Sequence, residues 1–222
     1  MSDELRVLMV DDDPFTRSML ASSLQVIGCY VSSSGTASEG LRLMRAFEPS
    51  AAPNVALLDL DLGEGPTGID LATILREEFP SIGIIILSTY SDPRLIGSKQ
   101  QVMPKRSLYL VKQSVVDATV LESALREALA LGTGKSGSDA LLPSSPLQSL
   151  SDAQLEIMRL VASGLSNSEI ARQQWMTEAA VEKAVARLCK KIGLKFEKDK
   201  NQRVMVALAY HEFTGNPSVR RS

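Results

Sequence analysis

The chain has 222 residues, of which 44% are hydrophobic and 23% charged, ordinary values for a globular protein with one large or two modest domains. No apolar run approaches the roughly 20 residues that a membrane span needs, and no secretory signal begins the chain, so we expect a cytoplasmic protein without a membrane partner. Two distant cysteines and a single histidine, His211, disfavour a disulfide framework or a zinc site and exclude a histidine-rich metal site.

The net charge of −2 is unevenly distributed along the chain. Residues 1–131 carry 11 Lys and Arg against 17 Asp and Glu, whereas residues 150–214 carry 10 against 8. An acidic half followed by a mildly basic half suggests different partners for the two. The basic excess alone is too small to indicate nucleic-acid binding.

The first part of the chain, residues 1–131, alternates strand-like apolar runs with helical patterns. We expect strands at 5–10, 30–33, 55–58, 82–87 and 108–111. We expect helices at 15–26, 36–47, 67–78, 92–101 and 114–131, the first capped by Asp13 and the fourth weakened by Gly97. This alternation predicts an α/β domain with a five-stranded, doubly wound parallel sheet, whose ligands bind at the carboxyl ends of the strands.

The rest of the chain differs in composition and pattern. Residues 132–149 are rich in Gly, Ser and Pro and are predicted to form a flexible linker; the Gly134-Lys135-Ser136 tripeptide lacks the spacing of a phosphate-binding loop. Helices at 150–163, 168–173, 177–192 and 199–213 predict an all-α, four-helix domain over 150–214. Residues 215–222 are expected to be a disordered tail, and Trp175 is expected to pack in the core.

Polar residues follow four of the predicted strands. They are Asp11, Asp12 and Asp13, then Asp59 and Asp61, then Ser88 and Thr89, and finally Lys112. Parallel strands bring these ends to one edge of the sheet, where clustered carboxylates repel each other unless a divalent cation or a lysine pairs with them. A carboxylate beside Mg²⁺ and a lysine is well placed to attack a phosphoryl group.

These motifs resemble the receiver domain of two-component response regulators. The similarity rests on Val10-Asp11-Asp12-Asp13-Pro14, Leu57-Leu58-Asp59-Leu60, Leu87-Ser88-Thr89 and Tyr109-Leu110-Val111-Lys112 and covers residues 4 to 131. The resemblance implies that Asp59 is the phosphoacceptor and that Ser88 and Lys112 contact the phosphoryl group. It implies that Tyr109 is the switch aromatic. The Mg²⁺ ligands that it implies are Asp11, Asp12, Asp59 and the backbone carbonyl of Asp61. A sensor histidine kinase would be the donor, and no enzymatic activity is expected beyond self-phosphorylation and slow self-dephosphorylation.

The sequence departs from the receiver pattern in three places. Asp13 stands where related chains often have histidine, the loop at 63–68 is longer than usual, and Gln113 follows Lys112. A phosphatase of the haloacid dehalogenase type is the alternative from another class, because Asp59-Leu60-Asp61 matches its Asp-x-Asp signature. That family places the signature near the N-terminus, whereas here an acidic pair precedes it.

Residues 150–194 resemble the LuxR-type helix-turn-helix of the NarL/FixJ response regulators, through Leu155 to Ala171 and Val181. The resemblance implies double-stranded DNA as a partner and a homodimer when active, with Val204 and Leu208 on the dimer face. The expected DNA-contacting residues are Thr177, Glu178, Lys183, Arg187, Lys190 and Lys191. Glu182 and Ala184 replace a lysine and a histidine that are usual in the family. The alternative is therefore a phosphorylation-independent or partner-dependent regulator whose C-terminal domain mainly binds protein.

Overall fold

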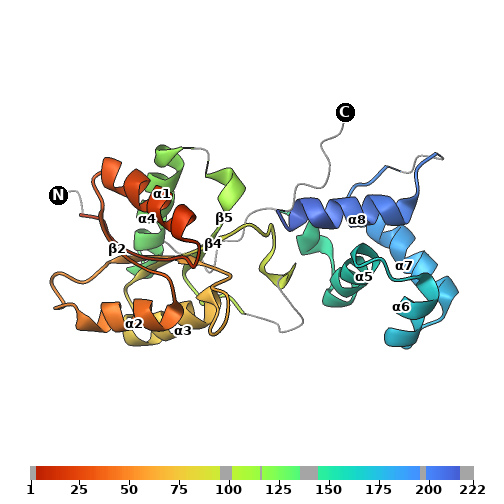
Figure 1. The fold of residues 1–222 in the computed structure, drawn as a ribbon, viewed down its shortest axis with the longest axis horizontal. Coiled ribbons are helices and arrows are strands. Elements are labelled where there is room, and N and C mark those ends of the chain that lie inside the picture. Colours follow the sequence, from red (N-terminus) through yellow and green to blue (C-terminus); the bar gives the residue numbers. More distant parts are fainter. Residues whose placement is uncertain (1–3, 96–101, 116, 136–144, 196–198, 216–222) are drawn as a thin grey trace. The chain divides into compact units, whose positions relative to one another are not determined.

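The computed structural model describes residues 4–95, 102–115, 117–135, 145–195 and 199–215. Contacts between residues divide the chain into two compact units, which are described separately (Figure 1). The first unit comprises residues 1–89 and 101–143, and the second comprises residues 90–100 and 144–222. The second unit is therefore built from two separate stretches of chain.

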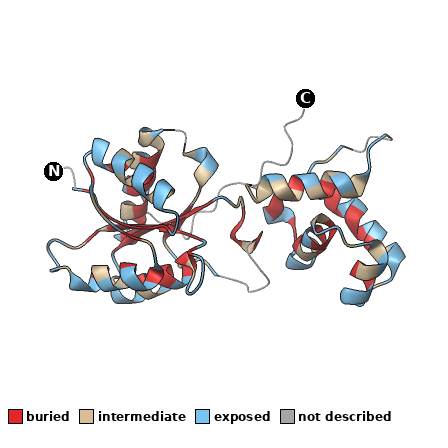
Figure 2. Cartoon of the chain, in the orientation of Figure 1, coloured by how far each residue is buried: buried red, intermediate tan, exposed pale blue. Residues whose placement is uncertain are grey.

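The first unit contains a sheet of five parallel strands in the order β2-β1-β3-β4-β5. The strands are β1 (Arg6–Val10), β2 (Tyr30–Ser34), β3 (Val55–Asp59), β4 (Gly83–Ser88) and β5 (Ser107–Val111). Every residue of β3 and β4 is buried (Figure 2), as expected for near-continuous apolar runs covered on both faces. The predicted doubly wound α/β fold is confirmed.

Four α-helices cover this sheet. They are α1 (Pro14–Val26), α2 (Ala37–Ala46), α3 (Gly68–Glu78) and α4 (Ala118–Gly132). In Figure 1, α1 and α4 lie on one face and α2 and α3 on the other. Met9 and Leu57 contribute to the same buried cluster as Leu24 of α1 and Leu125 of α4. Leu8 and Leu58, the adjacent residues along β1 and β3, are also fully buried, so the alternation of side chains along each strand supplies a hydrophobic core on both sides of the sheet.

The helix predicted at 92–101 differs from the observed structure. Its described part forms only a short 3₁₀ helix, η1 (Pro93–Leu95), and residues 96–101 lie outside the described residues. Leu95 is buried in the core of the second unit, and the Ser91 amide donates to the Phe213 carbonyl at 2.8 Å. For residues 92–95, tertiary contacts within the second unit therefore outweigh the weak helical propensity.

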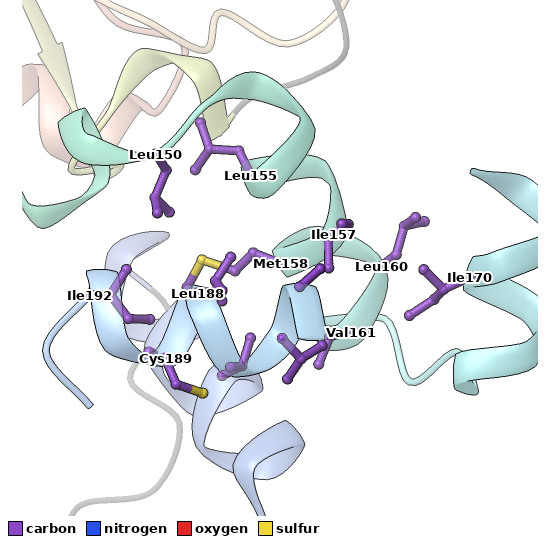
Figure 3. Packing of buried hydrophobic residues seen from close by; sticks show 14 of the residues in the cluster. Leu150, Leu155, Ile157, Met158, Leu160, Val161, Ile170, Leu188, Cys189 and Ile192 are labelled. Atoms are coloured by element: carbon purple, nitrogen blue, oxygen red, sulfur yellow. The ribbon is translucent and has the colours of Figure 1, made fainter. Parts of the chain in front are cut away.

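The second unit contains the four predicted helices. They are α5 (Asp152–Ala162), α6 (Asn167–Gln173), α7 (Glu178–Lys191) and α8 (Gln202–Phe213), with a 3₁₀ helix η3 (Pro146–Ser149) before them. Each α-helix begins at a side-chain cap, and α5 has a capping box formed by Ser151 and Gln154. Figure 3 shows the core, where Met158 and Val161 of α5 lie with Leu188 of α7.

The linker predicted at 132–149 is structured at both of its described ends. Helix α4 continues to Gly132, and Leu147 in η3 is fully buried in the core of the second unit. Residues 136–144 lie outside the described residues, as do residues 216–222 of the predicted tail. The domain boundaries stay a prediction. Across the described ranges, no helix is both long and apolar enough to span a membrane.

Candidate functional site

Three carboxylates meet at the carboxyl edge of the sheet. Asp11 and Asp12 follow β1, and Asp59 is the last residue of β3. One ligand oxygen from each lies within 4.8 Å of the others. Asp11 and Asp59 are 1% and 8% exposed, whereas Asp12 is exposed. The predicted cluster of Asp11, Asp12 and Asp59 is thus brought together.

Lys112, the residue after β5, reaches into this cluster. Its Nζ atom donates to Asp59 Oδ2 at 2.9 Å and to Asp11 Oδ2 at 3.1 Å. The register of the sheet explains this reach, because Asp59 pairs with Leu87 of β4, and Ser88 pairs with Val111 of β5. Ser88, the last residue of β4, and Lys112, the residue after β5, consequently lie at the same edge as Asp59.

The pKa values of Asp59 and Lys112 reflect burial and close charges. Burial raises the pKa of Asp59 to about 6; Lys112 opposes this rise, and the charges of Asp11 and Asp12 add to it. Burial alone would lower the pKa of Lys112, but its contacts with Asp59 and Asp11 raise it overall. One lysine cannot balance three ionised carboxylates, so the cluster retains excess negative charge. These oxygen ligands and that charge fit Mg²⁺.

The remaining predicted residues of this site differ in their placement. Ser88 is 1% exposed and Thr89 is exposed at the end of β4. Tyr109 is 2% exposed, so its ring is already buried and no inward rotation is needed to bury it. Asp61 is exposed, and its carboxylate accepts from the Gly63 amide at 3.3 Å. The role of the Asp61 carbonyl as a ligand stays a prediction.

Asp13 is engaged by helix α1. Its carboxylate accepts from the amides of Phe15 and Thr16, which confirms the predicted cap, and the hydrogen bond from the Thr16 hydroxyl is the main cause that lowers its pKa. The Asp13 carboxylate thus stabilises the start of α1.

Sequence reasoning missed Arg17, whose guanidinium donates to the Asp11 carbonyl at 2.5 Å. A sequence signal for this contact exists, because Arg17 lies in the first turn of the helix that directly follows Asp11-Asp12-Asp13.

Gly68, the first residue of α3, lies directly against the end of strand β3. A Cβ atom on Gly68 would come within 2.0 Å of the Asp59 carbonyl oxygen and 3.2 Å of the Leu60 Cα. The Gly68 amide donates to the Leu60 carbonyl at 3.0 Å. The long loop at 63–68 therefore ends in a tight backbone contact beneath the carboxylate cluster.

The second unit contains a helix-turn-helix made of α6 and α7. Of the six residues predicted to contact DNA, all are exposed: Thr177, Glu178, Lys183, Arg187, Lys190 and Lys191. The Thr177 hydroxyl caps α7 by accepting from the Ala180 amide at 3.2 Å. Lys191 has a structural role as well, because its Nζ donates to the Ser149 carbonyl at 2.8 Å and to Gln154 Oε1 at 3.0 Å.

Charges along the exposed side of α7 are segregated. Glu178 and Glu182 lie in its first half together with Lys183, and Arg187, Lys190 and Lys191 lie in its second half. Acidic residues near the N-terminus and basic residues near the C-terminus complement the helix dipole. The end of α7 that would enter a DNA groove is consequently its acidic end.

The prediction that Trp175 packs in the core is wrong. Its side chain is 96% exposed, in the turn between α6 and α7. Its backbone has a φ of 54°, the left-handed conformation that bulky residues rarely adopt. The turn fixes this geometry, and the ring is directed away from the core as a result.

The residues predicted for a dimer face lie on α8. Val204 is 55% exposed and Leu208 is 40% exposed, and their spacing of four residues places them on one side of the helix. Val206 and Ala209 on the other side are buried in the core of the second unit. Helix α8 thus exposes a second set of apolar side chains, Val204 and Leu208, in addition to those that pack in the core.

A five-stranded parallel sheet with an acidic cluster and a lysine at its carboxyl edge, followed in the chain by a helix-turn-helix, is the arrangement of a two-domain regulator. Residues 7–125 match the response regulator receiver domain family, and residues 148–202 match the luxR family of bacterial regulatory proteins. The chain belongs to the response regulators with a LuxR-type DNA-binding domain.

Similar proteins span nearly the whole chain. The DNA-binding transcriptional activator DevR/DosR of Mycobacterium tuberculosis is 30% identical over 208 residues, covering 86% of this chain and 89% of the relative. A nitrate/nitrite response regulator homologue of Haemophilus influenzae is 28% identical over 207 residues, covering 87% and 93%. A structure of two RcsB dimers bound to DNA shares the fold, with a TM-score of 0.57, 21% identity and coverage of 95% and 99%.

Proposed function

We propose that Asp59 accepts a phosphoryl group from a sensor histidine kinase and that this controls dimerisation and binding to double-stranded DNA. The observation that carries the proposal is the contact of Lys112 with both Asp59 and Asp11 beside Asp12. In the transfer, an Asp59 oxygen forms a bond to phosphorus as the bond to the donor breaks. Lys112 would then stabilise charge on the phosphoryl oxygens, as a cation does in such transition states.

Mg²⁺ is the cofactor that this proposal requires. Asp11, Asp12 and Asp59 would hold it, and the ion would neutralise phosphoryl oxygens during transfer. The buried Ser88 hydroxyl, one residue past the strand pair of Asp59 and Leu87, would contact the transferred group. Thr89 and Tyr90 follow directly, and Tyr90 is the first residue of the second unit, so a shift of Ser88 would be passed to that unit along the chain.

DNA binding and dimerisation are supported by the second unit. The exposed cations Lys183, Arg187 and Lys190 offer phosphate contacts, and Val204 and Leu208 offer an apolar dimer face. DevR/DosR is a DNA-binding transcriptional activator, and the similar RcsB structure contains dimers bound to DNA. We therefore favour DNA over a protein partner for this unit.

The proposal is tested by the intact mass of the protein after incubation with Mg²⁺ and a small-molecule phosphodonor. The parent should gain one phosphoryl group, and Asp59→Asn should gain none, because the amide is not a nucleophile. Asp61→Asn serves as the matched control and should still be phosphorylated, since only the backbone of Asp61 is expected to contact the metal. An adduct on Asp59→Asn, or none on the folded parent, would contradict the proposal.

Mg²⁺ should stabilise the first unit more at pH 7.5 than at pH 5. The folded pKa of Asp59 is about 6, above its ordinary value of 3.8, so the folded state holds this proton more tightly than the unfolded state does. Without metal, stability therefore falls as the pH rises from about 4 to about 6, and the ionised cluster stays repulsive above that. Mg²⁺ binds the ionised form and offsets this repulsion.

The measurement is the Tm followed by circular dichroism at the two pH values with and without Mg²⁺. Asp59→Asn should show a much smaller increase at pH 7.5, because the charged carboxylate is replaced by a neutral amide, which binds Mg²⁺ more weakly. An equal increase at both pH values in the parent would exclude binding by this carboxylate cluster.

A further inference from the structure

The end of helix α6 is unusual among the helix ends of this chain. After α6 the Met176 amide donates to the Ala171 carbonyl at 2.9 Å, which closes the helix through a left-handed residue at position 175. Glycine is favoured at such a position because it has no Cβ atom. Five other helices are followed by a glycine with positive φ: Gly28, Gly134, Gly164, Gly193 and Gly215. Helix α6 alone among these six ends has tryptophan there.

The Trp175 side chain is not stabilised by packing against the other residues that the structure describes. Its side chain is 96% exposed, whereas its neighbour Met176 is packed against the core of the second unit. The backbone on either side is fixed, since the Gln174 amide donates to the Ile170 carbonyl at 2.9 Å and Thr177 caps α7. An indole is thus held in a strained conformation and displayed to solvent. Strained residues of this kind concentrate at functional sites.

The location of Trp175 indicates what it contacts. It lies two residues before the cap of α7, the helix whose first turn would enter the major groove. That turn has Glu178 as its charged residue, and Glu182 follows in the next turn; neither attracts phosphates. Besides the exposed Thr177 hydroxyl, an apolar contact with deoxyribose and base edges is a source of affinity that this end can offer. An indole has a large flat face for such a contact.

We infer that Trp175 is a DNA-contacting residue, whose ring packs against the sugars and base edges of duplex DNA beside the start of α7. The inference rests on the proposed DNA binding. Because the contact is apolar, it adds affinity that is independent of salt. The cations of α7 add the salt-dependent part, through release of counterions from phosphates.

The test uses full-length protein treated with phosphodonor and a fluorescein-labelled duplex enriched from a random pool by that protein. Trp175→Gly should weaken binding about ten-fold, as loss of a central aromatic contact does, while the slope of affinity against salt stays unchanged. Trp175→Phe should retain most of the affinity. Lys183→Ala should instead lower the salt slope by about one. Val26→Ala, which removes an exposed apolar residue of the first unit, is the control and should bind normally.

The Tm of the Trp175→Gly variant distinguishes a DNA-contacting role of Trp175 from a structural role. Trp175→Gly relieves the left-handed strain, so its Tm should equal or exceed that of the parent while its affinity falls. A fall in both would assign Trp175 to the fold and overturn the inference. Trp175 is the single tryptophan of the chain, so its fluorescence should also become shielded from acrylamide when the duplex binds.

The possible failures are distinguishable. If no duplex is enriched or bound, the DNA-binding proposal fails and the inference fails with it. If a duplex binds but Trp175→Gly has parental affinity and acrylamide still quenches the bound protein fully, only the inference is overturned.

Discussion

Gly68→Ala should destabilise the first unit by about 3 kcal/mol or more, a large effect for one methyl group. The added Cβ would lie 2.0 Å from the Asp59 carbonyl oxygen and 2.9 Å from its carbonyl carbon. Both atoms belong to the backbone of a fully buried strand, so neither can rotate away. Helix α3 would have to move off β3, and Asp59 would move with its backbone. Mg²⁺-dependent stabilisation should therefore decrease as well.

Urea unfolding followed by circular dichroism measures this effect. Gly35→Ala is the matched control, because its Cβ would meet the end of the flexible Arg17 side chain at 3.3 Å, and a shift of a few tenths of an ångström relieves that contact while the Arg17 guanidinium stays beside the Asp11 carbonyl. Gly35→Ala should change stability by less than about 1 kcal/mol. Equal stabilities of the two variants would show that α3 does not depend on close approach at Gly68.

Arg94→Ala should destabilise the second unit by about 3–5 kcal/mol, the cost of leaving a buried charge without its partner. Arg94 donates to both carboxylate oxygens of Asp92, at 2.8 and 3.0 Å, and Asp92 is 5% exposed. It also donates to the carbonyls of Leu147 and Leu150, at 2.8 and 2.9 Å. Alanine would leave the buried carboxylate and both carbonyls without this donor.

Asp152→Asn provides the control for Arg94→Ala. Asp152 is the outer partner of Arg94, at 3.3 Å, and its side chain is 55% exposed, so its charge is screened by water. Its replacement should cost less than about 1 kcal/mol. If Arg94→Ala cost no more than this control in urea unfolding, residues 92–95 would not be held to the second unit as described.

The sheet and the carboxylate cluster could be predicted because their signals are local. Continuous apolar runs indicate buried parallel strands, and polar residues that follow them must meet at one edge. The placement of Asp11, Asp12, Asp59 and Lys112 follows from strand order alone. Helix caps such as Asp13 and Thr177 could also be predicted from the sequence, because a short polar side chain just before a helical pattern can accept hydrogen bonds from the free amides of the first turn.

The errors concern features that depend on distant contacts. The stretch at 92–101 has a weak helical pattern, but Leu95 and Arg94 find partners some 50 residues away, in η3 and α5. Trp175 was assigned to the core on residue type, whereas the left-handed turn after α6 directs it outward. Neither contact partners nor backbone handedness can be read from hydrophobic periodicity. The same holds for Lys191, whose structural contacts reach Ser149.

The assignment of residues 90–95 to the second unit also has a practical consequence. A DNA-binding fragment that starts at residue 144 would lack Leu95, Arg94 and the Ser91 amide, and would leave the Leu147 and Leu150 carbonyls and the Phe213 carbonyl without these donors. A receiver fragment that ends at residue 143 would retain that stretch without its partners. Dissection at a single peptide bond thus damages both products. Mixing the two fragments should restore the missing contacts, because residues 90–95 of the receiver fragment can bind to the DNA-binding fragment.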